Sequence, residues 1–317
     1  MSLLTVFDSL VLPVIASPMF IVSGPKLVLA QCRAGIVGSM PALNARPQAQ
    51  LRDWLAELIE SLAEAQRAHP DAPPAPFAIN QIVHASNARL EADIKTCVDC
   101  RVPIWITSLQ APPRELIDAV HAYGGVVMHD VVNLRHAEKA LAAGVDGLIA
   151  VAAGAGGHAG RLSPFALIGE IRRIFSGPLA LSGAIASGDA ILAAQAMGAD
   201  LAYIGTRFIA SAEATASDAY RHGLVDASAA DIVYTDAITG VHGNYLRASL
   251  LANGLDPEAL PAGAGRLLLE GKDAKAWRDI WGAGQGVGLI DDAPAVADIV
   301  QRLRREYDAA RRRLLGA

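Results

Sequence analysis

Eight short apolar segments alternate with amphipathic segments between residues 11 and 205 of this 317-residue chain. Each apolar segment is nearly continuous, which is typical of β-strands that are buried on both faces of a parallel sheet. Strands that alternate with helices in this way indicate an α/β fold, and eight such units favour a closed (β/α)₈ TIM barrel over an open sheet. The expected strands are Val11–Ser17, Gly35–Met40, Phe77–Val83, Pro103–Ser108, Val126–His129, Gly147–Ala152, Leu179–Ser182 and Leu201–Gly205.

The amphipathic segments between these strands predict the outer helices, because their apolar residues recur at the spacing of one helix face. The clearest of them are Leu51–Arg67, Arg114–Tyr123, Leu134–Ala143 and Ala190–Met197. Near the end of the chain, Ala295–Leu315 has the same pattern and reads as the last barrel helix.

The alternation of strands and helices breaks after Phe208. From about Ala212 to Asp279 the sequence indicates helices and turns without a strand, and Asn253-Gly254 and Pro261-Ala262-Gly263 are turn signals within it. We therefore expect a barrel over residues 1–211, a helical insertion on the substrate side over residues 212–280, and a return to the barrel over residues 281–317.

Composition excludes several classes of protein. The chain is 52% hydrophobic, with a formal net charge of −5 and a sequence pI near 5.9, so neither nucleic-acid binding nor a polybasic membrane surface is expected. Every long apolar run is interrupted well before the ~20 residues that a membrane span needs, and no signal-peptide pattern opens the chain. Three cysteines, an odd number, suit a reducing compartment, so we expect a cytoplasmic protein.

The pair Cys97 and Cys100 has the spacing of a redox or zinc motif, but either role needs a thioredoxin-like setting or a second ligand pair. Neither is present, so the pair is interpreted as the end of a helix that packs on the next strand. No two histidines have metal-ligand spacing with a carboxylate partner, and no metal site is expected.

Ligands of such a barrel bind at the carboxyl ends of the strands, and phosphate groups favour the loops after strands seven and eight. Here those loops begin Ser182-Gly183 and Gly205-Thr206, and both offer backbone N–H groups and hydroxyls where a helix begins. Asn80, near the end of strand three, would either bind a flat heterocycle or link neighbouring strands.

The loop after strand six contains four glycines, four alanines and one histidine, His158, between residues 152 and 165. Small residues let the backbone approach a ligand closely. They also provide no bulk that would pack around a core imidazole, so a functional role is favoured for His158. For His129, at the end of strand five, a structural role and a role beside a cofactor remain equally open.

Taken together, these local motifs resemble the nitronate monooxygenase family, formerly called 2-nitropropane dioxygenases, which are FMN enzymes on a TIM barrel with an added helical domain. The resemblance rests on their order along the chain: Pro18-Met19, Asn80, Ala155-Gly156-Gly157-His158-Ala159-Gly160, Leu181-Ser182-Gly183, Gly205-Thr206-Arg207-Phe208 and Trp281-Gly282-Ala283-Gly284-Gln285-Gly286.

The resemblance implies a role for each matching residue. Pro18, Met19 and Phe20 would pass by the flavin ring, and Asn80 would hydrogen-bond it. Ser182, Gly183, Gly205 and Thr206 would hold the FMN phosphate. The loop residues Ala153, Gly156 and Gly157 would approach the flavin, His158 would face the substrate, and Gln285 would reach the cofactor from the late loop.

Two positions depart from the family pattern. Some members carry a lysine where this chain has Asp130, and several carry a glutamate where it has Gly154. An acidic group beside the flavin would disfavour the anionic reduced form, which a cation stabilises. Asp130 is therefore expected to point away from the flavin.

The resemblance implies an enzyme that oxidises alkyl nitronates, or nitroalkanes, with molecular oxygen to carbonyl compounds and nitrite. A neutral nitroalkane must first lose its α-proton, and an imidazole with a pKa near ambient pH would suit His158 to take it. Two alternatives stay open: an NAD(P)H-dependent flavin reductase acting on quinones or enoyl thioesters, and a non-catalytic flavin-binding protein. The expected partners are a small-molecule substrate and O₂, and a homodimer is the candidate assembly.

Overall fold

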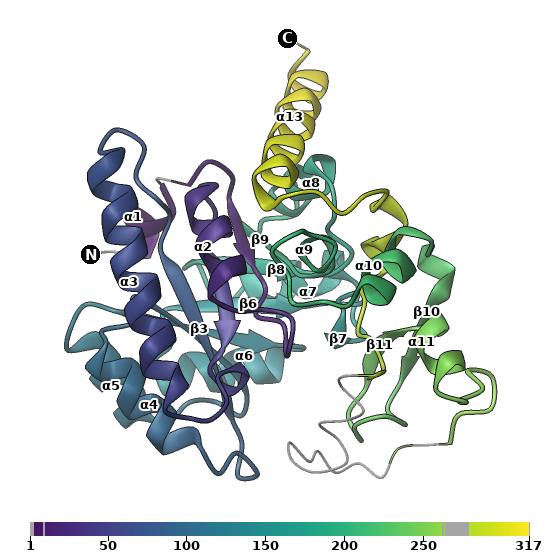
Figure 1. Ribbon diagram of the computed structural model, residues 1–317, viewed down its shortest axis with the longest axis horizontal. Helices are drawn as coiled ribbons and strands as arrows, with labels where there is room; N and C mark the ends of the chain where they lie inside the picture. The colour runs from purple at the N-terminus through teal and green to yellow at the C-terminus, as the bar shows by residue number, and fades with distance from the viewer. Residues whose placement is uncertain (1–2, 9, 262, 264–278, 317) are drawn as a thin grey trace.

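The computed structural model describes residues 3–8, 10–261, 263 and 279–316. Across these residues, eight parallel strands form one sheet in the order β1-β9-β8-β6-β5-β4-β3-β2, so the predicted barrel and all eight predicted strands are confirmed (Figure 1). The strands are β1 (Val14–Ala16), β2 (Gly38–Pro41), β3 (Phe77–Val83), β4 (Ile104–Leu109), β5 (Val126–Val131), β6 (Gly147–Val151), β8 (Leu179–Ser182) and β9 (Leu201–Ile204).

The sheet closes between its two ends, β1 and β2. Ala16 N donates to Val37 O at 2.8 Å, and Val37 N donates to Val14 O at 3.1 Å, so the chain just before β2 completes the ring. Ile15 and Val37 form the parallel bridge at this point. Closure leaves no open edge in the parallel sheet, and an unpaired edge would expose backbone hydrogen-bonding groups.

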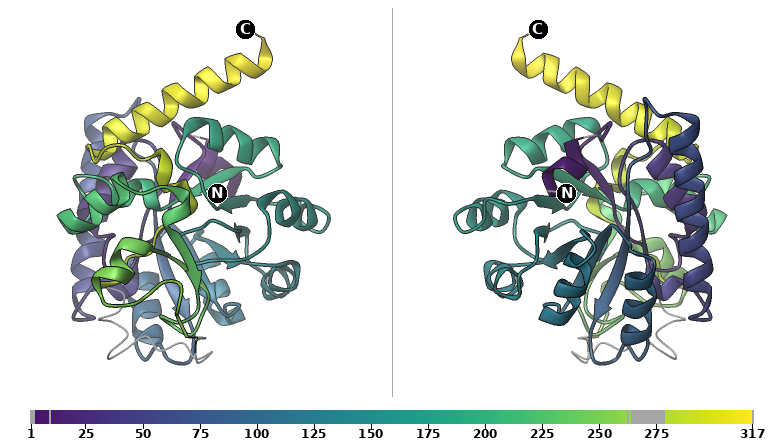
Figure 2. Two further views of the ribbon diagram at one scale, coloured as in Figure 1. Left: turned by 90° about the vertical axis from the view of Figure 1, so that its right-hand side faces the viewer. Right: turned by 90° about the vertical axis from the view of Figure 1, so that its left-hand side faces the viewer.

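Helices surround the barrel and confirm the predicted outer layer (Figures 1 and 2). Those that follow successive strands are α2 (Pro25–Arg33), α3 (Gln50–Ala68), α4 (Leu90–Asp99), α5 (Arg114–His121), α6 (Leu134–Ala143), α7 (Pro164–Arg172), α8 (Gly188–Ala196), α9 (Thr206–Ile209) and α13 (Val296–Leu315). A short helix, α1 (Leu3–Asp8), precedes the first strand. The carboxyl end of α13 extends away from the rest of the molecule.

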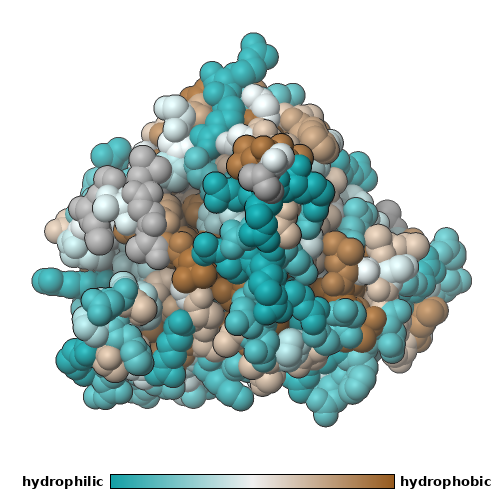
Figure 3. Space-filling model, turned by 90° about the horizontal axis from the view of Figure 1, so that it is seen from above, coloured by the Kyte–Doolittle hydropathy of each residue, from teal (hydrophilic) through white to brown (hydrophobic). Residues whose placement is uncertain are grey.

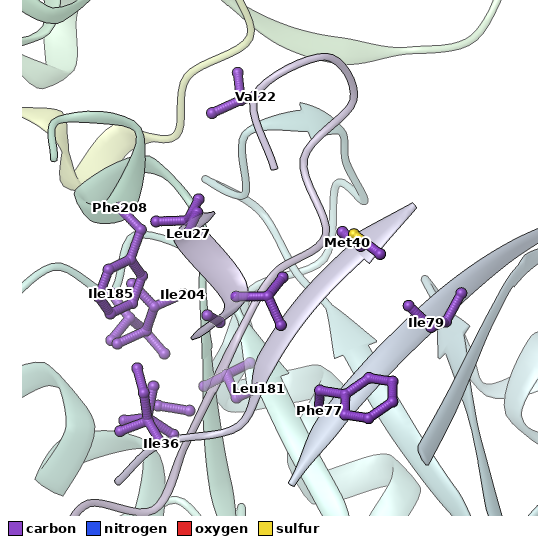
Figure 4. Packing of buried hydrophobic residues seen from close by; sticks show 14 of the residues in the cluster. Val22, Leu27, Ile36, Met40, Phe77, Ile79, Leu181, Ile185, Ile204 and Phe208 are labelled. Carbon is purple, nitrogen blue, oxygen red and sulfur yellow. The ribbon is translucent and has the colours of Figure 1, made fainter. Parts of the chain in front are cut away.

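Buried residues form two layers because successive strand side chains point to opposite faces. In β4, Trp105 belongs to the layer between strands and helices, whereas Ile104 and Ile106 belong to the barrel interior. Figure 4 shows part of the outer layer, where Leu27, Ile185, Ile204 and Phe208 gather. This alternation decides which residues at the strand ends face the inside.

The segment after the barrel differs from its prediction. It contains the helices α10 (Asp218–Val225) and α11 (Arg247–Ala252), as expected, but also two strands, β10 (Ile232–Thr235) and β11 (Gly243–Leu246). These pair with each other and with β7 (Gly157–His158) in a three-stranded antiparallel sheet. The expectation of no strand was wrong. The β-branched and aromatic residues of β10 are typical of a strand, and β10 pairs with the nearby β11. The pairing of β11 with β7, about 85 positions away, is one that no local pattern reveals. Residues 262 and 264–278 of the predicted insertion lie outside the described residues.

The small sheet fixes the loop that carries the histidine. Asn244 on β11 is buried, and its Nδ2 donates to Ala155 O at 2.7 Å. The backbone also pairs Gly243 with His158 and Asn244 with Gly157. A loop built from small residues, which could not hold itself by packing, is therefore held by hydrogen bonds from another part of the chain.

The outer surface is mostly hydrophilic in the view of Figure 3, and hydrophobic residues there form separate patches. Within the described ranges, the molecule has no helix of the length and apolarity that a bilayer crossing requires.

Replacing Asn244 by alanine tests the attachment of the loop. The substitution leaves the buried Ala155 carbonyl without its donor, so the free energy of unfolding should fall by about 1–3 kcal/mol. Urea unfolding measures this change, and the exposed Gln301→Ala variant, which should change stability by no more than about 0.5 kcal/mol, is the control. Equal stability of the two variants would show that β11 does not hold the loop.

Candidate functional site

One cavity of about 400 Å³ lies at the carboxyl ends of the barrel strands, a volume in the usual range for cofactor and small-molecule sites. The strand ends, the loop after β1, the β7 loop, α10 and the segment after residue 280 enclose it. It is lined by Ser17, Pro18, Met19, Phe20, Ile21, Val22, Asn80, Ile82, Ser108, Leu109, Asp130, Val151, Gly156, Gly157, His158, Ser182, Tyr203, Gly205, Thr206, Ile209, Thr215, Ala216, Ser217, Tyr220, Trp281 and Gly282.

Most of the residues predicted for the site lie together in this cavity. The lining includes Pro18, Met19, Phe20, Asn80, Gly156, Gly157, His158, Ser182, Gly205 and Thr206. The remaining four, His129, Ala153, Gly183 and Gln285, do not line it. Their assignment to a cofactor stays a prediction.

Two of those four pack behind the cavity wall. A Cβ on Gly183 would lie 2.7 Å from Ala153 O, so glycine is required there by close backbone packing. Gln285 N donates to Gly154 O at 2.9 Å and joins the late loop to the β7 loop. In the structure these residues support the residues that face the cavity.

His129 lies on the outward face of β5. Its Nδ1 is 2.8 Å from Thr107 Oγ1 on the neighbouring strand, and burial lowers the pKa of the imidazole to about 4. The ring is therefore neutral near pH 7 and linked to β4. Of the two roles considered for it, this geometry favours the structural one.

Asp130, one residue further, faces the cavity, contrary to the expectation that it points away. Its side chain is in phase with Val126 and Met128 of the barrel interior. Burial raises the pKa of its carboxyl to about 7, although the hydrogen bond from Ser108 acts in the opposite direction. The sequence prediction did not include Asp130, Ser108 and Tyr203 among the site residues, because both faces of these strands are apolar and no alternation indicates which side chains face the barrel interior.

A chain of hydrogen bonds connects the polar residues at three strand ends. Asn80 Nδ2 donates to Ser108 Oγ at 2.7 Å, and Ser108 Oγ donates to Asp130 Oδ2 at 2.7 Å. Asn80 Nδ2 also donates to Ile106 O at 3.1 Å, so this amide links neighbouring strands as well as lining the cavity.

His158 faces the cavity from β7, and burial lowers its pKa to about 4. This pKa lies below the near-ambient value that would best suit a general base, and desolvation of the imidazole is the cause. Its Nε2 lies 3.1 Å from Thr239 Oγ1, whose hydroxyl donates to Val241 O. Thr239 Oγ1 consequently accepts from Nε2–H, and this tautomer leaves the basic lone pair on Nδ1.

The loop after β1 is held in a strained conformation. Ile21 has a φ of 67°, a region that β-branched residues rarely adopt. Asn44 fixes the loop, because its Oδ1 accepts from Ile21 N at 2.9 Å and its Nδ2 donates to Met19 O and Ser23 O. Such strain persists only where surrounding contacts over-determine it, and it is common at ligand sites.

An aromatic pair forms another wall of the cavity. The rings of Tyr220 and Trp281 stack with centroids 4.9 Å apart and planes 12° apart. Tyr220 comes from α10 and Trp281 from the late segment, so two regions outside the barrel sequence complete the enclosure.

The residues at hand fit a flavin. Apolar side chains such as Met19, Phe20 and Tyr203 can enclose a flat ring, whereas Asn80 and Asp130 offer polar groups at its edges. Within the described residues, no group of three or more histidine, cysteine or acidic side chains is placed to hold a metal ion.

The end of the cavity near β8 and β9 suits an anionic group. Ser182 and Thr206 bring hydroxyls to adjacent strand ends, and the chain turns into α9 directly after Gly205. Thr206 Oγ1 accepts from Gly284 N at 2.9 Å, which connects this end to the late segment.

The raised pKa of Asp130 makes a prediction about stability. Because its ordinary pKa of 3.8 rises to about 7 in the folded state, the folded protein holds a proton that the unfolded chain loses. The contribution of Asp130 to the free energy of unfolding is therefore greatest below about pH 4 and is lost as the pH rises through about 7. Asp130→Asn should therefore gain stability relative to wild type with rising pH, on the order of 1.4 kcal/mol per pH unit between those values.

Thermal unfolding at pH 4.5 and pH 8 measures the effect. The difference between Asp130→Asn and wild type should be larger at pH 8, whereas the exposed Asp53→Asn control should show no such change. A difference that is the same at both pH values would mean that Asp130 is ionised in both states.

Comparisons with known proteins identify the family of this chain. A family model described as nitronate monooxygenase matches residues 1–306. A nitronate monooxygenase of Paraburkholderia phytofirmans is 28% identical over 93% of this chain and 92% of its own length. A (3aS,4S,5R,7aS)-5-hydroxy-7a-methyl-1-oxo-octahydro-1H-indene-4-carboxyl-CoA dehydrogenase of Rhodococcus jostii is 26% identical over 75% of this chain and 64% of its own length.

Two solved structures share the fold. A nitroalkane oxidase of Streptomyces ansochromogenes aligns with a TM-score of 0.81 and 23% identity, covering 97% of this chain and 99% of its own. FabK of Thermotoga maritima aligns with a TM-score of 0.77 and 24% identity, covering 98% of this chain and 97% of its own. Because the family model covers nearly the whole sequence, the chain belongs to the nitronate monooxygenase family of flavin-dependent oxidoreductases.

Proposed function

We propose that this protein uses FMN and molecular oxygen to oxidise alkyl nitronates, and nitroalkanes after deprotonation, to carbonyl compounds and nitrite. The observation that carries the proposal is that His158 faces the same cavity as the strand ends that suit a flavin and its phosphate. The flavin, when bound, supplies the electron transfer and the oxygen chemistry, and the protein supplies binding, orientation and electrostatics.

The cofactor would be held by residues from opposite sides of the barrel mouth. Ser182, Gly205 and Thr206 would hold the phosphate, with Gly183 shaping the turn behind them. Met19 and Phe20 would cover the ring from the strained loop, and Asn80 would contact its polar edge. The distribution of apolar walls and convergent polar groups supports this assignment.

His158 would act as the base for a neutral nitroalkane. Its lowered pKa keeps the imidazole neutral near pH 7, and the hydrogen bond with Thr239 assigns the proton to Nε2, so Nδ1 would be the atom that accepts the α-proton. A pKa of about 4 alone makes a weak base. The nitronate anion that forms beside the ring would raise this pKa in the complex, because an opposite charge favours the protonated form.

A reductase remains the second candidate, because relatives of this chain include a protein named as a CoA-thioester dehydrogenase. Such an enzyme would take electrons from NAD(P)H and pass them to a quinone or an enoyl thioester, rather than take them from a nitronate. A flavin in the enclosed cavity would serve either reaction, so the electron donor distinguishes them.

The electron donor is therefore the first test of the reaction. Purified protein loaded with FMN should consume oxygen when an alkyl nitronate is added, without any nicotinamide, as an oxygen electrode measures. Rapid anaerobic bleaching of the flavin by NADH together with no oxygen uptake on nitronates would replace this proposal with the reductase.

His158→Asn tests the role of the base. The variant keeps polarity and approximate size but cannot accept the proton, so activity on neutral nitroalkanes should fall ~10²-fold or more. Oxygen uptake on preformed nitronates should fall much less, and the protein should stay yellow. An equal loss on both substrates would assign His158 to binding the anion, and unchanged rates would remove it from the mechanism.

A further inference from the structure

The carboxyl of Asp130 has one oxygen that the protein does not satisfy. Oδ2 accepts a hydrogen bond from Ser108, but Oδ1 is buried and has no hydrogen-bond partner in the part of the chain that the structure describes. A buried polar atom without a partner carries a large desolvation cost. Because Asp130 lines the cavity, the missing partner is to be sought on a ligand.

The neighbouring hydrogen bonds decide which oxygen carries a proton. Ser108 Oγ accepts from Asn80 and donates its own hydrogen to Asp130 Oδ2. Oδ2 is thus committed as an acceptor, and a proton bound by the carboxyl resides on Oδ1. In the neutral form, Oδ1–H is a donor with no acceptor in the described protein.

The groups around Asp130 do not compensate its charge. Across the barrel on β9, Tyr203 is buried with its pKa raised well above the ordinary value, partly by the Asp130 charge, so it stays neutral. His158 on β7 and the outward-facing His129 on β5 are both neutral near pH 7, because burial lowers their pKa values to about 4. Among these described neighbours, none supplies a positive charge that would stabilise an Asp130 carboxylate near neutral pH.

We propose that Asp130 takes up a proton when the flavin binds and donates it, from Oδ1, in a hydrogen bond to an acceptor atom of the ring. This inference rests on the proposed flavin site. An acceptor atom of the ring would give Oδ1–H the partner that the protein lacks, which favours the protonated carboxyl, and no neighbouring cation favours the carboxylate. The position occupied by lysine in some family members would here be served by a neutral donor.

Proton uptake makes flavin binding depend on pH. When a group has a higher pKa in the complex than in the free protein, binding is coupled to proton uptake. Binding then weakens as the pH rises above the pKa of the free protein. For wild type, the Kd for FMN should rise about tenfold per pH unit above pH 7. Asp130→Asn replaces Oδ1–H by an amide donor of nearly the same size, so it should bind FMN without this dependence.

The test is titration of the flavin-free protein with FMN between pH 5.5 and pH 8.5, followed by flavin fluorescence. Wild type, Asp130→Asn and the exposed Asp53→Asn control are compared at each pH. The ionisation of the FMN phosphate affects all three proteins equally, so it cancels in the ratio of the variant Kd to the wild-type Kd. Titration with riboflavin, which lacks the phosphate, repeats the comparison. Calorimetry at pH 8 in two buffers of different ionisation enthalpy should show uptake of nearly one proton by wild type and none by Asp130→Asn.

The outcomes separate this inference from the function that underlies it. Failure of wild type to bind FMN at any pH would overturn the flavin site itself. Binding with the same pH profile in wild type and Asp130→Asn, or without proton uptake by wild type, would overturn the role of Asp130 alone. Tighter wild-type binding at higher pH would also overturn it, because the carboxylate would then accept a hydrogen bond instead of donating one.

Discussion

Closing the parallel sheet between β1 and the segment before β2 fixes which side chains face the inside of the barrel. Ala16 and Val37 make this closure through backbone hydrogen bonds, and every strand around the ring then presents alternate residues to the interior. Because the strands are parallel, their carboxyl ends lie at one mouth. The last inward-facing residues, among them Asn80, Ser108 and Asp130, therefore converge there although they are far apart in the chain.

Desolvation sets the electrostatics of that mouth. It lowers the pKa of the half-buried His158 imidazole, on the loop that pairs with β11, to about 4. It raises the pKa of the Asp130 carboxyl, on barrel strand β5, to about 7. One physical cause, loss of hydration, thus shifts an acid and a base in opposite directions, and each shift favours the neutral form.

Rigid support for the mouth comes from outside the barrel strands. Asn44 holds the strained Ile21 loop with three hydrogen bonds, and the stack of Tyr220 on Trp281 closes the other side. These contacts join the first βα loop, α10 and the late segment around one volume. A ligand therefore meets walls that are already ordered, which reduces the entropy cost of binding.

The sequence determined the barrel and its outer helices, and it singled out ten residues that the structure brings together in one cavity. Continuous apolar strands between amphipathic helices have few alternative architectures, and glycine-rich turns at successive strand ends mark a ligand site by local chemistry alone. The pairing of β11 with β7 could not be predicted, because the two strands are distant in the chain, whereas β10 and β11 are local neighbours and β10 has the β-branched and aromatic residues of a strand. Tertiary structure also decided which of the two neighbours, His129 or Asp130, faces the cavity. Val126, Val127 and Met128 are all apolar because both faces of β5 are buried, so no alternation in the sequence indicates which face is inside. Only closure of the barrel sets that phase, and it turns His129 toward the helices and Asp130 toward the ligand.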